Sequence, residues 1–154
     1  MQGTHCRPTS VTMFADTLLQ AEQLHLFRLL VWGGGSIIVG TLMFVILAWR
    51  RPAVTMLRHF GIQMVLWGVL ELVYVLWAWH GLGLRDVSGA TRLDRLLWLN
   101  LGLDLGAVGV GASIALLGWV NGKRLGLLGS GVGIVIQAAV IFLINAQLAA
   151  SISR

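Results

Sequence analysis

Residues 60–80 read FGIQMVLWGVLELVYVLWAWH, a long apolar run with a single acid. It has about the 20 residues that an α-helix needs to cross the hydrocarbon core of a bilayer. Its apolar residues do not alternate with polar ones as they would in a membrane β-strand, so we expect a helix. Glu71 lies near its middle. A carboxyl group at that depth is costly and usually faces protein or a water-filled cavity.

Three further stretches of the same kind cover residues 26–49, 96–119 and 125–148. Short connections make consecutive helices antiparallel neighbours. The sequence therefore predicts an all-α, integral membrane protein in which residues 26–154 form one domain, a four-transmembrane-helix up-down bundle. In that topology both chain ends lie on the same side of the membrane.

Residues 1–25 precede the first predicted span as an N-terminal tail. Within it, Ser10 to His25 has the pattern of a short amphipathic helix, with Phe14 and Leu18 on its apolar stripe. One interpretation is a helix lying in the plane of the membrane interface. The other is a simple extension of the first span into water, and the sequence does not decide between them.

Composition excludes several classes of protein. Of the 154 residues, 57% are hydrophobic and 11% are charged, whereas soluble domains carry about 25% charged residues. The net charge of +5 comes from basic residues clustered at the ends of the spans. That placement follows the positive-inside rule and is not a nucleic-acid-binding stripe. We therefore expect the lipid bilayer, and no nucleic acid, as a partner.

Polar residues in three spans fall at a similar depth. Because a helix rises about 1.5 Å per residue, Glu71, Gln137 and Asp104 lie about 16, 18 and 22 Å from the membrane face with the short loops. These depths are near the centre of a core about 30 Å thick. No lysine or arginine lies at the centre of a span. We expect at least one of the two acids to hold a proton at neutral pH, because two charged carboxyl groups in a dry centre are costly.

Helical spacing predicts that further polar side chains share the inward faces. The candidate polar core, which is also the candidate ion or proton site, consists of Glu71, Asp104, Gln137, Asn100, Tyr74 and Asn145. Glycine pairs at spacing four, which allow close approach of helix backbones, occur at Gly102–Gly106 and Gly129–Gly133. The polar core is interpreted either as a hydrogen-bonded network that fixes the register of the helices, or as a protonatable or cation-binding site.

Other residues give weaker signals. His25 and His80 fall near the same membrane face and are the weak candidates for haem or pigment ligation. Most of the seven tryptophans lie near span ends, as in an aromatic belt, while Trp32 and Trp67 are candidates for the interior. We find no catalytic, metal-binding or nucleotide-binding motif. We therefore expect no enzymatic activity, no metal and no cofactor.

Two segments, residues 97–106 and 131–145, resemble a bacterial family of small four-helix membrane proteins that is catalogued only as a domain of unknown function. The resemblance rests in the third helix on Asn100 followed four residues later by Asp104. In the fourth helix it rests on a glycine-rich start followed by Gln137. It covers roughly the last two thirds of the chain.

The chain departs from that family at two positions. The family tends to have an asparagine where this chain has Glu71, and an acid where it has Asn145. The resemblance implies four membrane helices and a bacterial inner (cytoplasmic) membrane location. It implies no activity, because the family has none assigned.

Three functions are compatible with the sequence. The first is a non-enzymatic membrane protein, a small subunit or packing module with a buried polar core, which associates with other membrane subunits or with itself. The second is a proton- or cation-coupled carrier that uses Glu71 and Asp104. The third is a haem- or pigment-binding subunit.

Overall fold

The computed structural model of the chain describes residues 10–50 and 54–152. Within these ranges the chain is all-α and forms α1 (Ser10–Arg50), α2 (Thr55–His80), α3 (Val87–Val120) and α4 (Leu125–Ile152). Each helix is long and apolar enough to cross a membrane. The predicted four-helix, all-α architecture is confirmed.

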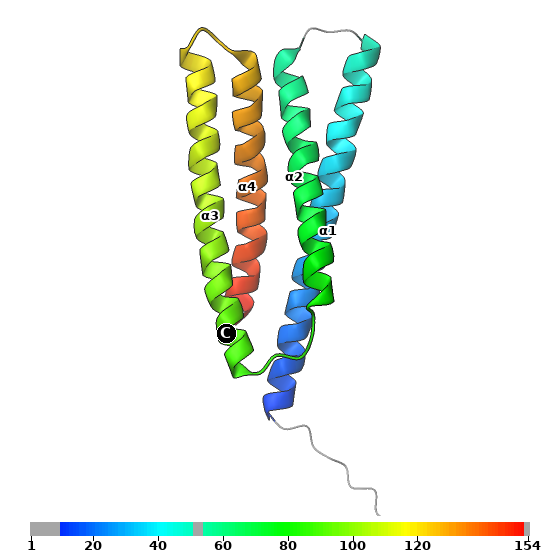
Figure 1. Cartoon of the computed structure of the whole chain (residues 1–154), viewed down its shortest axis with the longest axis vertical. Helices are drawn as coiled ribbons and strands as arrows, with labels where there is room; N and C mark the ends of the chain where they lie inside the picture. The colour runs from blue at the N-terminus through cyan, green and yellow to red at the C-terminus, as the bar shows by residue number, and fades with distance from the viewer. Residues whose placement is uncertain (1–9, 51–53, 153–154) are drawn as a thin grey trace, which may run out of the picture.

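The helices alternate up and down and stand in the spatial order α3, α4, α2, α1 (Figure 1). Helices α1 and α2 form one antiparallel pair, and α3 and α4 form the other. The pairs are joined mainly by α4 against the parallel α2, with some contact of α4 with α1. Among the residues described, α3 packs against α4 alone. The expectation that all consecutive helices are neighbours is therefore wrong for α2 and α3.

The structure also corrects the N-terminal segment. Ser10 to Arg50 form one continuous helix, so residues 10–25 are not a separate amphipathic helix and instead extend the first predicted span. The stripe expected to be apolar contains Leu18 and also a buried acid, Glu22. Residues 1–9 of the predicted tail lie outside the described residues.

Helices α1 and α2 meet at two pairs of glycines. A Cβ atom at Gly68 would lie 2.6 Å from the carbonyl oxygen of Gly33, and one at Gly40 would lie 2.8 Å from that of Gly61. Within each helix the two glycines are seven residues apart, which is two helical turns, so both pairs lie on one face. Side chains at these positions would force the two backbones apart.

Glycines of α4 face two different helices. Gly129 lies against the backbone of Met56 and Gly133 against the side chain of Gln63, both in α2, whereas Gly131 faces Gly111 of α3. The predicted role of Gly129 and Gly133 in close packing is confirmed.

The other predicted glycine pair behaves differently. Added Cβ atoms at Gly102 and Gly106 would meet nothing within 4 Å among the described residues, so this pair faces outward and its predicted packing role is wrong. Helix α4 has glycines towards both neighbours, and this explains why α4, rather than α3, lies beside α2.

The connection between α2 and α3 is tied to α1. Arg85 forms a two-pronged ion pair with Glu22 of α1, with N–O distances of 2.6 and 3.1 Å. Asp86 then caps α3 by accepting hydrogen bonds from the Gly89 N–H at 2.8 Å and from the Ser88 hydroxyl at 2.9 Å. The hydrogen bond from Gly89 has the largest effect on the pKa of Asp86, and both bonds lower it. The cap therefore contributes its full stabilisation of the fold at pH values above the ordinary carboxyl pKa. This stabilisation is lost as the pH falls through the lowered pKa of Asp86.

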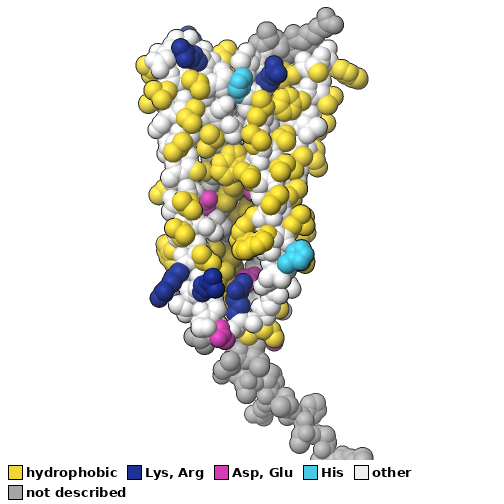
Figure 2. Space-filling view, viewed as in Figure 1, with side chains coloured by type: hydrophobic (Ala, Val, Ile, Leu, Met, Phe, Trp, Pro, Cys, Tyr) yellow, Lys and Arg dark blue, Asp and Glu magenta, His cyan; other side chains and the backbone are white. Residues whose placement is uncertain are grey.

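The outer surface matches a membrane environment. Large hydrophobic side chains cover the flanks between the helix ends, while lysine and arginine gather near the two ends (Figure 2). Soluble monomers rarely expose apolar patches of this extent. Five tryptophans, Trp49, Trp77, Trp79, Trp98 and Trp119, are exposed. Trp32 and Trp67 are half-buried, as predicted for the two interior candidates.

The helix order predicts the sidedness of the connections. In a Cys6→Ser background, Val54→Cys and Asn121→Cys should react with a membrane-impermeant maleimide from the same side of sealed vesicles, and Gly83→Cys only from the other. The physical reason is that one crossing separates each connection from the next. Labelling of Val54→Cys and Asn121→Cys from opposite sides would contradict the fold.

The glycine contacts predict a stability difference between two glycine substitutions. Gly68→Ala should lower the free energy of unfolding by about 1–3 kcal/mol, because the new methyl group meets backbone atoms. Gly106→Ala is the matched control and should be neutral or stabilising by up to about 1 kcal/mol, since alanine favours the helix and the space is open. Unfolding in detergent micelles measures both values, and equal effects would argue against the packing described.

Candidate functional site

A groove of about 230 Å³ runs between α2 and α3, with α4 as its floor. Five of the six predicted site residues line it, namely Glu71, Tyr74, Asn100, Asp104 and Asn145. Acidic side chains are visible in this hollow about half-way along the helices (Figure 2). The remaining walls are apolar except for Trp67, so the groove offers few polar groups on a hydrophobic background.

Glu71 reaches the groove from the α1–α2 contact. A Cβ atom at Gly33 would lie 3.1 Å from both the Cβ and Oε2 atoms of Glu71, so the absence of a side chain at Gly33 makes room for the acid. Glu71 is 6% exposed. Its two carboxyl oxygens are buried and make no hydrogen bond to any described residue. Most buried polar groups in proteins are hydrogen-bonded, so this acid stands out.

Asp104 is better satisfied than Glu71. Its Oδ2 atom accepts a hydrogen bond of 2.7 Å from Nδ2 of Asn145, which links α3 to α4. Asn145 is buried, whereas Asp104 and Asn100 are partly exposed towards the groove. Tyr74 is 42% exposed at the groove margin. Glu71 and Asp104 are not joined by a direct hydrogen bond.

Gln137 belongs to a different cluster. It is 0% exposed. Its oxygen accepts a 2.7 Å hydrogen bond from Nε1 of Trp32, and its amide nitrogen donates to the Ser36 hydroxyl at 3.0 Å and to the Met64 sulfur at 3.1 Å. One side chain of α4 thereby bonds both α1 and α2. Gln137 was predicted to belong to the same polar core as the two acids, but it bonds neither of them. Its bonds go to Trp32 and Ser36 of α1 and to Met64 of α2.

Sequence reasoning found the depth of these residues but missed several partners. The Gln137 partners Trp32 and Ser36 and the ion-paired Glu22 and Arg85 were not among the predicted site residues. A signal exists in the sequence: Trp32 and Ser36 continue the spacing of three and four that begins at Glu22 and defines the inward face of α1. The sequence predicts this inward face of α1 only when the polar residues on it are counted together with the apolar ones.

The two candidate haem ligands lie in different surroundings. His25 is buried and lines a pocket of about 370 Å³ between α1 and α4, and its Nδ1 atom makes no hydrogen bond to a described residue. His80 is exposed, and its Nδ1 atom donates to the Leu76 carbonyl at 2.6 Å. His80 is not part of the His25 pocket. Across residues 10–50 and 54–152, no group of three or more acids, histidines or cysteines is arranged to hold a metal ion.

Residues 28–146 match the model of a family of unknown function, DUF6992. The chain belongs to this family. The match begins within α1, so it extends further than the last two thirds of the chain over which the resemblance was noted, and it includes the whole groove. No curated protein and no solved structure matches the chain.

The Gln137 cluster predicts a large effect of one substitution. Gln137→Leu should lower the free energy of unfolding by about 1–2 kcal/mol, because Trp32 and Ser36 lose a buried hydrogen-bond partner. Gln147→Leu, in the same helix, is the matched control. Gln147 is exposed and bonds Arg28 at the surface, so its loss should change stability by less than about 0.5 kcal/mol. Steric-trapping measurements of unfolding in bicelles would give both values, and equal losses would show that the Gln137 bonds are not structural.

Proposed function

We propose that the protein is a small, non-enzymatic integral membrane subunit whose α2–α3 groove binds a cationic group carried by a second membrane segment. The observation that carries the proposal is Glu71. Its two carboxyl oxygens are buried inside the groove and have no hydrogen bond to a described residue. A carboxyl group in this position is costly unless it holds a proton or meets a positive charge or a hydrogen-bond donor.

The shape of the groove supports a partner that comes from the bilayer. The groove separates α2 from α3, and Leu70 and Leu103, which line it, are 61% and 63% exposed. Apolar exposed margins are compatible with a neighbouring transmembrane helix. In membranes such helices associate through packing and interhelical polar contacts rather than through a hydrophobic driving force. A lysine or arginine side chain of that helix would meet the partly exposed Asp104 at the surface of the groove and Glu71 deeper inside it.

A proton- or cation-coupled carrier is the second candidate. It is favoured by the presence of Glu71 and Asp104 in one groove. The groove volume of about 230 Å³ is large enough to hold water molecules beside the two acids. This function requires that the groove connects to both membrane faces during a transport cycle, whereas a binding subunit requires no such path.

Haem or pigment binding is a weaker candidate. The His25 pocket supplies one buried imidazole, but His80 does not line it. An absorption spectrum of the purified protein in the Soret region tests this candidate directly.

Location in a bacterial cytoplasmic membrane is part of the proposal. It is supported by the four apolar helices and by the basic residues at their ends.

The proposal predicts selective binding of a basic membrane helix. The probe is a leucine-based transmembrane peptide with one central lysine, and its association with the labelled protein in vesicles is measured by energy transfer. The lysine peptide should bind about tenfold more tightly than the same peptide with leucine at that position, in keeping with the ~1–2 kcal/mol of interhelical polar contacts. Glu71→Gln should abolish this preference and leave the fold stable, because a neutral amide removes the possible buried charge.

Asp94→Asn removes an acid outside the groove and is the control that should keep the preference. Equal binding of the two peptides to the wild-type protein, or an unchanged preference in Glu71→Gln, would refute the proposal. A proton or cation flux through the wild-type protein in vesicles that disappears in stably folded Glu71→Gln would instead establish the carrier.

A further inference from the structure

A second pocket, of about 490 Å³, lies between α1 and α2 at the end where these helices are connected. The last close contact of the two backbones before this end is that of Gly40 with Gly61. Beyond it the helices diverge (Figure 1). The side chains that line the gap from α1 are the apolar Phe44, Leu47 and Ala48. The pocket therefore forms where α1 and α2 separate beyond the Gly40–Gly61 contact, and its α1 side is lined by apolar side chains.

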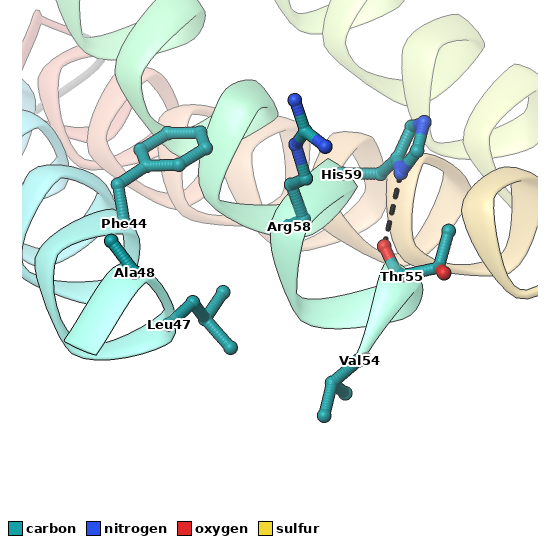
Figure 3. A pocket seen from close by; sticks show the side chains of 7 residues that line it. All are labelled: Phe44, Leu47, Ala48, Val54, Thr55, Arg58 and His59. Atoms are coloured by element: carbon teal, nitrogen blue, oxygen red, sulfur yellow. Dashed lines mark hydrogen bonds between the residues drawn. The ribbon is translucent and has the colours of Figure 1, made fainter. Parts of the chain in front are cut away.

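The opposite wall of the pocket is basic. Arg58 of α2 extends between Phe44 and His59 (Figure 3). The backbone N–H of Arg58 donates to the Val54 carbonyl at 3.2 Å, but its guanidinium group forms no hydrogen bond or ion pair with another described residue. The His59 ring is held on both sides: its Nδ1 atom donates to the Thr55 carbonyl at 3.0 Å, and its ring atoms lie against Gly126 of α4. The guanidinium group of Arg58 is thus the charged group of this wall that remains available to a ligand.

The surroundings of Arg58 are positive as well. Residues 54–59 and 119–126, which lie at this end of the molecule, contain no aspartate or glutamate. The turn between α3 and α4 adds Lys123, which lies over the Trp119 ring at 5.9 Å, and Arg124. Helix α2 also begins beside the pocket without a side-chain cap, so its N-terminal dipole adds to the positive field.

We propose that this pocket is a binding site for an anionic phospholipid, with its phosphate group on Arg58 and the upper part of an acyl chain against Phe44 and Leu47. Guanidinium groups bind phosphate through paired, charge-assisted hydrogen bonds. Basic pockets between membrane helices are suited to anionic headgroups. The apolar wall distinguishes a lipid from free phosphate, which would gain nothing from Phe44 and Leu47.

This site is independent of the groove that contains Glu71, since no residue lines both pockets. Its failure or success in experiment therefore says nothing about cation binding at Glu71, and the two proposals can be tested separately.

The test extracts the full-length protein from nanodiscs that contain phosphatidylglycerol and phosphatidylcholine. Native mass spectrometry then measures how much of each lipid stays bound to the protein. The wild-type protein should retain phosphatidylglycerol at least fivefold in preference to phosphatidylcholine. Arg58→Gln should reduce this preference about fivefold, as expected for one basic residue near the membrane surface. Arg92→Gln, at the exposed start of α3 at the other end of the molecule, is the matched control and should not change it.

Ala48→Trp provides a second variant that keeps Arg58 and fills the apolar part of the pocket. It should lower retention of phosphatidylglycerol while the helical content stays that of the wild type. Equal retention of the two lipids by the wild-type protein would overturn the proposal, as would an unchanged preference in folded Arg58→Gln. Displacement of the lipid by millimolar inorganic phosphate, together with no effect of Ala48→Trp, would identify a phosphate site and not a lipid site.

Discussion

Close contact of helix backbones at glycine is the constraint on which this structure depends. Inside a bilayer, helices gain little from burying apolar surface against one another, so they associate through close packing and polar contacts. Gly33, Gly40, Gly61 and Gly68 bring α1 onto α2, and glycines of α4 bring it onto the same α2. Once these three helices are together, α3 has only the far side of α4 to pack on. The groove between α2 and α3 follows directly from that arrangement.

The polar residues divide into satisfied and unsatisfied groups. Gln137 bonds α1 and α2 from the centre of α4, and Asn145 bonds Asp104 of α3. These bonds hold α4 to the other three helices and are sufficient reason for burying amide groups. Glu71 has no such role, because neither of its oxygens is bonded to a described residue. Gln137 and Asn145 therefore hold the helices together, whereas Glu71 is left available for a partner.

The sequence predicts depth along a helix far better than direction around it. Depth requires only the rise per residue, and Glu71 and Asp104, for which the sequence predicts similar depths, line one groove. Direction depends on which face of each helix packs, and each residue along a helix turns the side chain by about 100°. The outward Gly102–Gly106 pair and the glycines that do pack look alike in sequence. The bonds of Gln137 to Trp32, Ser36 and Met64 were therefore not predicted, because they depend on how α1 and α2 are rotated against α4.

The central claim is that Glu71 is unpaired and reachable from the bilayer through the groove. A lipophilic carbodiimide, which reacts with carboxyl groups that hold a proton in apolar surroundings, tests it in the folded protein by mass spectrometry of the labelled peptides. An adduct on Glu71 should form faster than one on Asp104, because Asn145 already occupies an oxygen of Asp104. Absence of an adduct on Glu71, or faster labelling of Asp104, would contradict this claim.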